Sequence, residues 1–218
     1  VMFGIREQSS TPYGNVWGGA TVNPKLWNAY QATDTRRGAS IISIADENID
    51  FKMKNNQREY TGYYIKKYTP MSDDAGNSLA VKMGGVNFMI GQFQDYVSIR
   101  YADVLLMYAE SLNATGSTAA AYEYVDPVRQ RAGLEPLSTA MPGLSQAQFL
   151  EQLKHERITE LSGEGHRWHD LARWGDLGPA LAPRDPAFAN FVPDKHELLP
   201  IPQQDIDINP MVEQNPNW

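Results

Sequence analysis

Residues 156–175 read ERITELSGEGHRWHDLARWG, and this stretch decides the fold. It sets charged groups of both signs beside large apolar side chains. These are the charged residues Glu156, Arg157, Glu160, Glu164, Arg167, Asp170 and Arg173, and the apolar residues Leu161, Trp168, Leu171 and Trp174. A free surface helix has no need of two tryptophans, and an ordinary core excludes this many charges. We therefore expect a partly buried segment whose glutamates pair with Arg157, Arg167 and Arg173.

Two glycines divide the stretch. Ser145 and Gln148 have the S-x-x-Q spacing of a capping box, which predicts a helix that runs to about Leu161. Gly163 and Gly165 then interrupt the helical period, so we expect a bend at 162–165 and a second helix after it. That second helix carries Trp168, Leu171 and Trp174 on one side. We expect its two tryptophans, like Trp27 nearer the N-terminus, to lie in the core.

A helical hairpin is expected before this stretch. From Tyr96 to Leu112 the apolar residues recur at steps of three and four, which is typical of an amphipathic helix. The apolar face consists of Ile99, Ala102, Leu105, Leu106, Ala109 and Leu112. Gly116 ends this helix, and Ser117 or Thr118 can cap a second one. Pro127 lacks an amide hydrogen, so we expect it to kink or split the second helix near Asp126.

The remaining segments are less regular. Asn23 followed by Pro24 predicts a short helix, and residues 40–45 and 60–68 read as short strands. We expect a mainly α fold in three parts. Residues 1–95 form a loop-rich segment with a short helix and short strands, which contributes to the ligand site. Residues 96–175 form the helical signature region, and residues 176–218 form an extended, proline-rich C-terminal wrap.

Composition excludes several classes of function. The formal charge of −7 disfavours nucleic acid, which requires a concentrated basic surface. Cysteine is absent, so a thiol nucleophile, a thiolate metal site and a disulfide framework are all excluded. No apolar run approaches the ~18 residues that a membrane-spanning helix needs.

The residues also argue against catalysis. His155-Glu156 begins like the zinc motif H-E-x-x-H, but position 159 is threonine. His166 and His169 could share a helix face, yet no third ligand has a recognisable spacing. A glycosidase needs two carboxylates that face each other across the substrate, whereas glutamates in helical register lie along one surface. We expect no catalytic residue, no metal site and no cofactor.

Three motifs, in order, resemble those of the SusD/RagB family. They are IRYADVLLMYAESL (99–112) with VRQRAGL (128–134), the 156–175 stretch, and ELLPIPQQDIDINP (197–210) with QNPNW (214–218). The family consists of outer-membrane nutrient-binding lipoproteins of Bacteroidetes-type bacteria. The chain resembles the C-terminal portion of these proteins. The resemblance implies a tetratricopeptide-like helical hairpin with further helices, long loops and a few short strands.

The resemblance also implies a function and partners. It predicts non-catalytic, cell-surface binding of an oligosaccharide or polysaccharide for uptake through a SusC-like TonB-dependent outer-membrane transporter. It further predicts a lipid anchor in an N-terminal region absent from this chain, and the N-terminal half of the same protein as a partner. Two alternatives stay open: RagB-like binding of peptides, and a scaffold that contacts the transporter and has no ligand site of its own.

Aromatic residues on loops are the candidates for sugar binding, because sugars stack their C–H faces on aromatic rings. Trp17 and Tyr13 lie in the glycine-rich stretch TPYGNVWGGATVN, which has neither helical nor strand periodicity. We predict Trp17 as a stacking platform, Tyr13 as a second one and Asn15 as a polar group at the rim. Phe88, in the long loop 70–95, is a further candidate. The alternative for Trp17 is packing against the N-terminal half.

Overall fold

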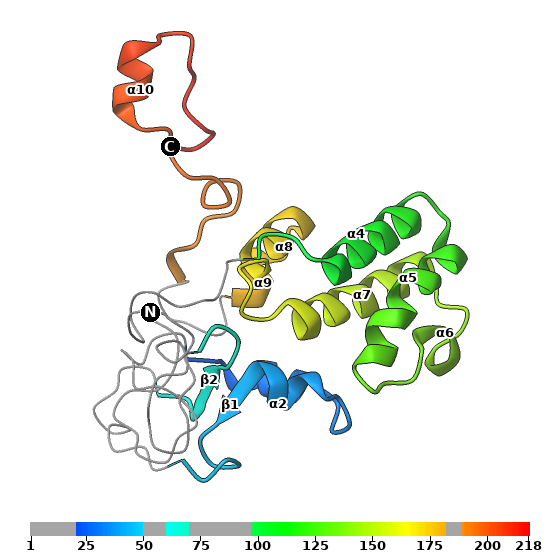
Figure 1. Ribbon diagram of the computed structural model, residues 1–218. Helices are drawn as coiled ribbons and strands as arrows, with labels where there is room; N and C mark the ends of the chain where they lie inside the picture. The colour runs from blue at the N-terminus through cyan, green and yellow to red at the C-terminus, as the bar shows by residue number, and fades with distance from the viewer. Residues whose placement is uncertain (1–20, 50–59, 70–96, 182–188) are drawn as a thin grey trace, which may run out of the picture. The chain divides into compact units, whose positions relative to one another are not determined.

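The computed structural model describes residues 21–49, 60–69, 97–181 and 189–218, and it is mainly helical (Figure 1). The mainly α fold expected from the sequence is therefore confirmed. The helices are α1 (Pro24–Ala29), α2 (Arg36–Ser40), α4 (Tyr101–Ala114), α5 (Thr118–Arg131), α6 (Leu137–Ala140), α7 (Gln146–Leu161), α8 (Arg167–Trp174), α9 (Leu177–Leu181) and α10 (Gln203–Ile208). The strands are β1 (Ile41–Ser43) and β2 (Tyr63–Ile65).

The chain folds as two compact units, Val1–Glu164 and Gly165–Trp218. The boundary between them falls inside the 156–175 stretch, at Gly165. Gly163 and Gly165 have φ values of +77° and +88°, a conformation that costs glycine little and other residues more. The predicted bend between two helices is therefore confirmed. The division into segments 1–95, 96–175 and 176–218 stays a prediction.

The main core of the first unit lies between α4, α5 and α7, which pack side by side (Figure 1). Gly116, with φ of +84°, turns the chain from α4 into α5 and forms the expected hairpin. The buried residues of this core are Leu106, Ala109, Ala121, Tyr122, Val125, Val128, Leu137, Phe149 and Leu153. Ser145 and Gln148 form the predicted capping box at the start of α7. Each of these helices thus buries one apolar stripe against the other two.

Two details of the hairpin differ from the prediction. Helix α4 begins at Tyr101, because Arg100 has an extended backbone (φ −135°, ψ 162°) and its side chain reaches toward α7. Ile99 therefore lies before the helix and is exposed, not buried. Helix α5 runs through Pro127 without being split. The buried side chains of Val125 and Val128, on either side of the proline, hold the helix together against the ~3 kcal/mol that an internal proline costs.

A smaller part of the first unit surrounds the two-stranded sheet. β1 and β2 pair antiparallel, with Ile42 opposite Tyr64, in the segments where the sequence predicted strands. Helix α1 begins after Asn23, whose side chain accepts a hydrogen bond from the Lys25 amide at 2.9 Å. The Tyr30 hydroxyl, at the end of α1, donates to the Thr159 carbonyl of α7 at 2.8 Å. This bond ties the strand region to the helical core.

The second unit contains α8, α9 and α10. Leu171 of α8 is buried, but Trp168 keeps 42% of its surface exposed, so the prediction that Trp168 is a core residue is wrong. Periodicity identifies the apolar side of a helix but not how much of it a partner covers. Trp174 and Trp27 are half-buried. Helices α9 and α10 also show that the C-terminal part is not simply extended chain.

Among the described residues, no helix combines the length and the hydrophobicity that crossing a bilayer requires.

Gly163→Ala should destabilise the first unit by about 2–4 kcal/mol, through a strained φ and overpacking. A Cβ at position 163 would lie 2.9 Å from Cγ2 of the buried Ile65, a β-branched side chain with little freedom to move. Gly116→Ala is the matched control, because its φ is also positive but a Cβ there meets nothing within 4 Å. Urea unfolding would measure both variants, and equal losses would refute the predicted steric contribution.

Candidate functional site

The residues predicted to bind ligand lie in parts of the chain that the structure does not describe. Tyr13, Asn15 and Trp17 lie in residues 1–20 and Phe88 lies in residues 70–96, outside the described residues. Their assignment stays a prediction. What the structure does describe is the charged centre of the 156–175 stretch, which the sequence singled out for its density of titratable groups.

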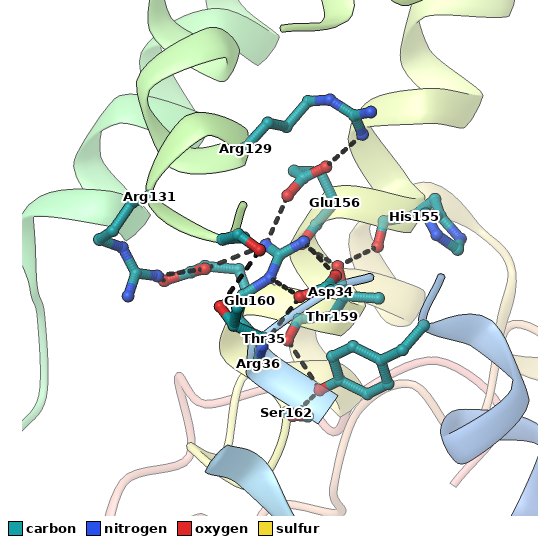
Figure 2. A network of polar contacts seen from close by, with 12 residues as sticks. Asp34, Thr35, Arg36, Arg129, Arg131, His155, Glu156, Thr159, Glu160 and Ser162 are labelled. Carbon is teal, nitrogen blue, oxygen red and sulfur yellow. Dashed lines mark hydrogen bonds and ion pairs between the residues drawn. The ribbon is translucent and has the colours of Figure 1, made fainter. Parts of the chain in front are cut away.

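Three glutamates at steps of four form this centre. Glu156 and Glu160 lie on one stripe of α7, and Glu164 follows just after the helix ends. All three are buried. Their placement along a single surface agrees with the expectation from helical register. Buried carboxylates require cations or donors close by, and Figure 2 shows that these come from several elements of the fold.

Arg36 of α2 is the central cation. Its Nη1 donates to Glu156 Oε1 at 2.5 Å and to Glu160 Oε2 at 3.0 Å. Its Nε and Nη2 donate to the two oxygens of Asp34 at 2.9 and 2.7 Å. Arg36 is only 6% exposed. One buried guanidinium therefore joins the start of α2 to two consecutive turns of α7, as Figure 2 shows.

The other glutamate partners come from α5 and from the residues before α4 and after β2. Arg131 Nη2 reaches both Glu160 oxygens, at 2.6 and 2.7 Å. Arg100 donates from Nη1 to Glu160 Oε1 at 2.6 Å and from Nε to Glu164 Oε2 at 2.6 Å. Lys67 Nζ lies 2.6 Å from Glu164 Oε1. Together with the bond from Arg129 Nη1 to Glu156 Oε2 at 3.0 Å, these contacts connect three separate segments to the last turns of α7 and to Glu164 just after it.

The expected ion pairing is present, and the structure gives the glutamates further partners that the sequence did not predict, such as Arg36, Arg100 and Arg131. Arg157 binds Asp103 of α4 at 2.9 Å, and Arg173 binds Asp170 within α8 at 2.9 Å. A residue next to a glutamate in sequence points to another side of the helix, so neighbours in sequence are poor guides to pairing. Arg100 and Arg131 could have been found, since they lie in or beside the motifs at 99–112 and 128–134. Arg36 and Lys67 carry no sequence signal.

The electrostatic consequence is that two of the glutamates stay ionised. Burial alone raises the pKa of Glu160, but hydrogen bonds from Arg100 and Arg36 and the charges of Arg100 and Arg131 hold it below its ordinary value. Burial likewise raises the pKa of Glu164, and Arg100 and Lys67 outweigh it. A glycosidase acid needs a raised pKa. Glu160 and Glu164 are therefore unsuited to that role.

The pKa values of the cations shift in different directions. Burial alone would lower the pKa of Arg36, but Asp34 and Glu156 raise it above the ordinary value. The pKa of Arg100 is raised in the same manner by Glu164 and Glu160, against the effect of burial. Lys67 differs, because burial lowers its pKa by more than Glu164 restores. The guanidinium groups are thus the permanent charges of the network.

A cleft of about 220 Å³ opens beside this network. It is lined by Arg36, Ala39, Ser40, Lys67, Arg100, Arg131, Glu160 and Glu164. Pockets that enclose a drug-sized ligand usually hold about 300–1,000 Å³ and are mostly apolar. This cleft is smaller and lined mainly by charged groups that already bind one another. It is therefore a poor site for a sugar chain.

The histidines do not gather around a metal. In the part of the chain that the structure describes, no group of three or more His, Asp or Glu residues is arranged to hold an ion. His166 occupies the N-cap position of α8, and His169 is exposed. Burial lowers the pKa of His155 below its ordinary value, despite the opposing charge of Glu156.

Comparison with known proteins identifies related sequences and folds. The SusD family model matches residues 47–218. SusD-like protein P2 of Formosa agariphila is 30% identical over 233 aligned positions, which cover 99% of this chain and 43% of that protein. A laminarin-binding SusD-like protein shares 29% identity and a TM-score of 0.75, over 100% of this chain and 43% of that one. Surface glycan-binding protein A from Bacteroides fluxus shares 27% identity and a TM-score of 0.69, over 99% and 44%.

Glu160→Gln should lower the free energy of unfolding by about 3 kcal/mol or more, because it removes the buried negative charge that Arg36, Arg100 and Arg131 share. Glu151→Gln is the matched control. Glu151 pairs with Lys154 on the surface of the same helix, where an ion pair contributes at most about 0.5 kcal/mol. Denaturant unfolding at neutral pH measures both. A loss for Glu160→Gln no larger than for Glu151→Gln would show that the network does not hold the fold.

The free energy of unfolding should also depend on pH. The pKa values of Glu160 and Glu164 in the folded state lie below the ordinary value of 4.5. The stabilisation that they provide is therefore complete above about pH 4.5 and is lost as the pH falls through their lowered pKa values, by up to ~1.4 kcal/mol per pH unit for each group. Unfolding curves between pH 7 and pH 3 should show this decline, with a shallower slope in Glu160→Gln. Parallel slopes would contradict the prediction.

Proposed function

The chain belongs to the SusD family, and on that premise we propose that it forms the C-terminal part of a protein that captures a glycan at the cell surface for import. Family members are non-catalytic glycan-binding proteins, which agrees with the expectation that this chain is not an enzyme. The chain spans 43% of the length of SusD-like protein P2. Binding, transport and location of the whole protein are therefore proposals.

One observation carries the proposal. The whole of this chain aligns with a laminarin-binding SusD-like protein at 29% identity and a TM-score of 0.75. The likeness to surface glycan-binding protein A from Bacteroides fluxus supports the same class of ligand. A neutral or weakly charged glycan also suits a chain with a formal charge of −7, which would repel a polyanion. Laminarin is thus the first glycan to test.

The described charges support a site on the loops and not at the ion-pair network. The carboxylates of the network bind guanidinium groups, and its cleft is small. We propose Trp17 and Tyr13 as stacking rings, Asn15 as a rim group and Phe88 as a further ring. Trp17 precedes Thr21 by four positions, and Thr21 pairs with Tyr64 of β2.

In this proposal the ion-pair network supports ligand binding indirectly. It holds the strand region against α7 and the residues just after it, through the buried contact of Arg36 with Glu160 and the partly buried contact of Lys67 with Glu164. A rigid support lowers the entropy that a binding loop loses when the ligand docks. The affinity of a transport protein must also allow release, so we propose moderate affinity with fast dissociation.

The proposed location and partners rest on membership of the SusD family. We propose a lipid-anchored protein in the outer membrane, with a SusC-like TonB-dependent transporter as its permanent partner and with the N-terminal half of the same protein beside it. Peptide binding of the RagB kind would need charged groups and backbone partners at the site. A scaffold without a ligand would bind neither glycans nor peptides.

Trp17→Ala should weaken binding of laminarin by at least about tenfold, because an aromatic platform contributes upward of ~1.4 kcal/mol at the centre of a site. Trp168→Ala is the matched control, since it removes an indole that is 42% exposed in the second unit. Isothermal titration with the full-length protein measures both.

The same titrations separate the alternatives. If Trp17→Ala leaves laminarin affinity unchanged, the proposed site is wrong while glycan binding stands. If the protein binds peptides from a panel and no glycan, the peptide alternative replaces the proposal. If it binds neither, the chain is a scaffold.

A further inference from the structure

The cleft beside the ion-pair network is lined by more cations than anions. Its charged lining consists of Arg36, Lys67, Arg100 and Arg131, and of Glu160 and Glu164. The groups behind the lining do not reverse this balance. Asp34 and Glu156 bind Arg36, but Glu156 also binds Arg129. Among the described residues, the connected network therefore holds five cations and four carboxylates, an excess of positive charge in a chain whose formal charge is −7.

Three of these cations keep hydrogen-bond donors that no described residue uses. Lys67 Nζ carries three hydrogens and donates two, to the Glu160 carbonyl and to Glu164 Oε1. Arg100 has five N–H donors and makes four bonds, so one Nη1 hydrogen remains. Arg131 binds Glu160 through Nη2 alone, which leaves its Nε and Nη1. The remaining donors come from three segments: the turn after β2, the residue before α4 and the end of α5.

Burial makes this excess of positive charge costly. The side chains of Lys67 and Arg100 are only 23% and 28% exposed, so water compensates their charges in part. Burial lowers the pKa of Lys67 by more than Glu164 restores, and the charge of Arg100 acts in the same direction as burial. An anion in the cleft would oppose both effects and would accept the remaining hydrogen bonds.

The size of the cleft and the arrangement of its donors favour a small tetrahedral oxyanion. A volume of about 220 Å³ equals the space of roughly seven water molecules at ~30 Å³ each, which holds one such ion with a few waters. A carboxylate offers two oxygens, whereas a sulfate or phosphate group offers up to four to donors from three directions. Guanidinium groups match oxyanions in geometry and charge. Arg131, with 60% of its side chain exposed, leaves this edge of the cleft open to solvent.

We propose that the cleft binds a tetrahedral oxyanion, a sulfate or phosphate group, through Arg131, Lys67 and Arg100. The chemistry is the same for a free inorganic ion and for the ester group of a sugar, so both sources enter the test. The inference does not depend on the glycan proposal. Loop aromatics are proposed there to stack on a neutral sugar, whereas the cleft binds a single anionic group.

Calorimetric titration of the full-length protein tests the proposal. The probes are inorganic sulfate, inorganic phosphate and a glucose sulfate ester, with glucose as the neutral control. Ionic strength is held constant with NaCl, because salt screens charge attraction. Arg131→Gln and Lys67→Gln remove donors from two different segments. Arg37→Gln is the matched control, since Arg37 lies over the Trp27 ring and outside the lining of the cleft.

We expect Arg131→Gln and Lys67→Gln each to weaken oxyanion binding at least roughly tenfold, since each removes a hydrogen bond from a charged donor. Arg37→Gln should bind like the parent. Circular dichroism checks that each variant is folded, and if one is not, the other decides. Binding of the inorganic ions would identify the free ion as the source, and binding of the ester alone would identify the sugar.

Two results would overturn the proposal. One is the absence of binding by the parent protein up to about 10 mM of every oxyanion. The other is an equal loss of affinity in Arg37→Gln, because general charge attraction and not the cleft would then hold the ion. Laminarin titration of the same samples tests glycan binding separately, so either proposal can fail alone.

Discussion

The fold of the first unit depends on the ion-pair network around Glu160. A buried carboxylate in an apolar setting costs several kcal/mol unless cations and donors surround it. Glu160 meets this requirement with Arg36, Arg100 and Arg131. Each of these cations comes from a different segment, so the glutamate can be satisfied only when α2, the residues before α4 and the end of α5 all reach α7. One electrostatic constraint therefore sets the relative positions of segments that lie far apart in sequence.

The ion-pair network fixes one arrangement of these segments more than it adds to the free energy of unfolding. An apolar core of the same volume could be as stable, because the attraction within a buried ion pair is largely offset by the loss of hydration. The network requires each buried charged side chain to meet a particular partner. Apolar contacts such as Leu106 against Phe149 tolerate small shifts, whereas the bidentate contact of Arg36 with Asp34 does not. A recognition surface supported on such a frame starts from one defined geometry.

Support and recognition are thus assigned to different residues. The 156–175 stretch, which looks most like an active site in sequence, holds the frame together, and two of its glutamates are kept ionised by their partners. Recognition of a glycan is proposed for the loop aromatics led by Trp17. These two roles fit a chain that is one portion of a SusD-family protein.

The sequence by itself determined the family, the mainly helical class, the capping box at Ser145, the bend at Gly163 and the strand positions, because each depends on local spacing or on residue conformation. It also indicated that the glutamates form ion pairs. It did not determine their partners, since Arg36 and Lys67 meet them only through long-range packing. Nor did it show that α5 passes through Pro127 or that Ile99 and Trp168 are exposed. Tertiary structure decided these points, because burial depends on which segment covers a side chain, and periodicity contains no information about the covering segment.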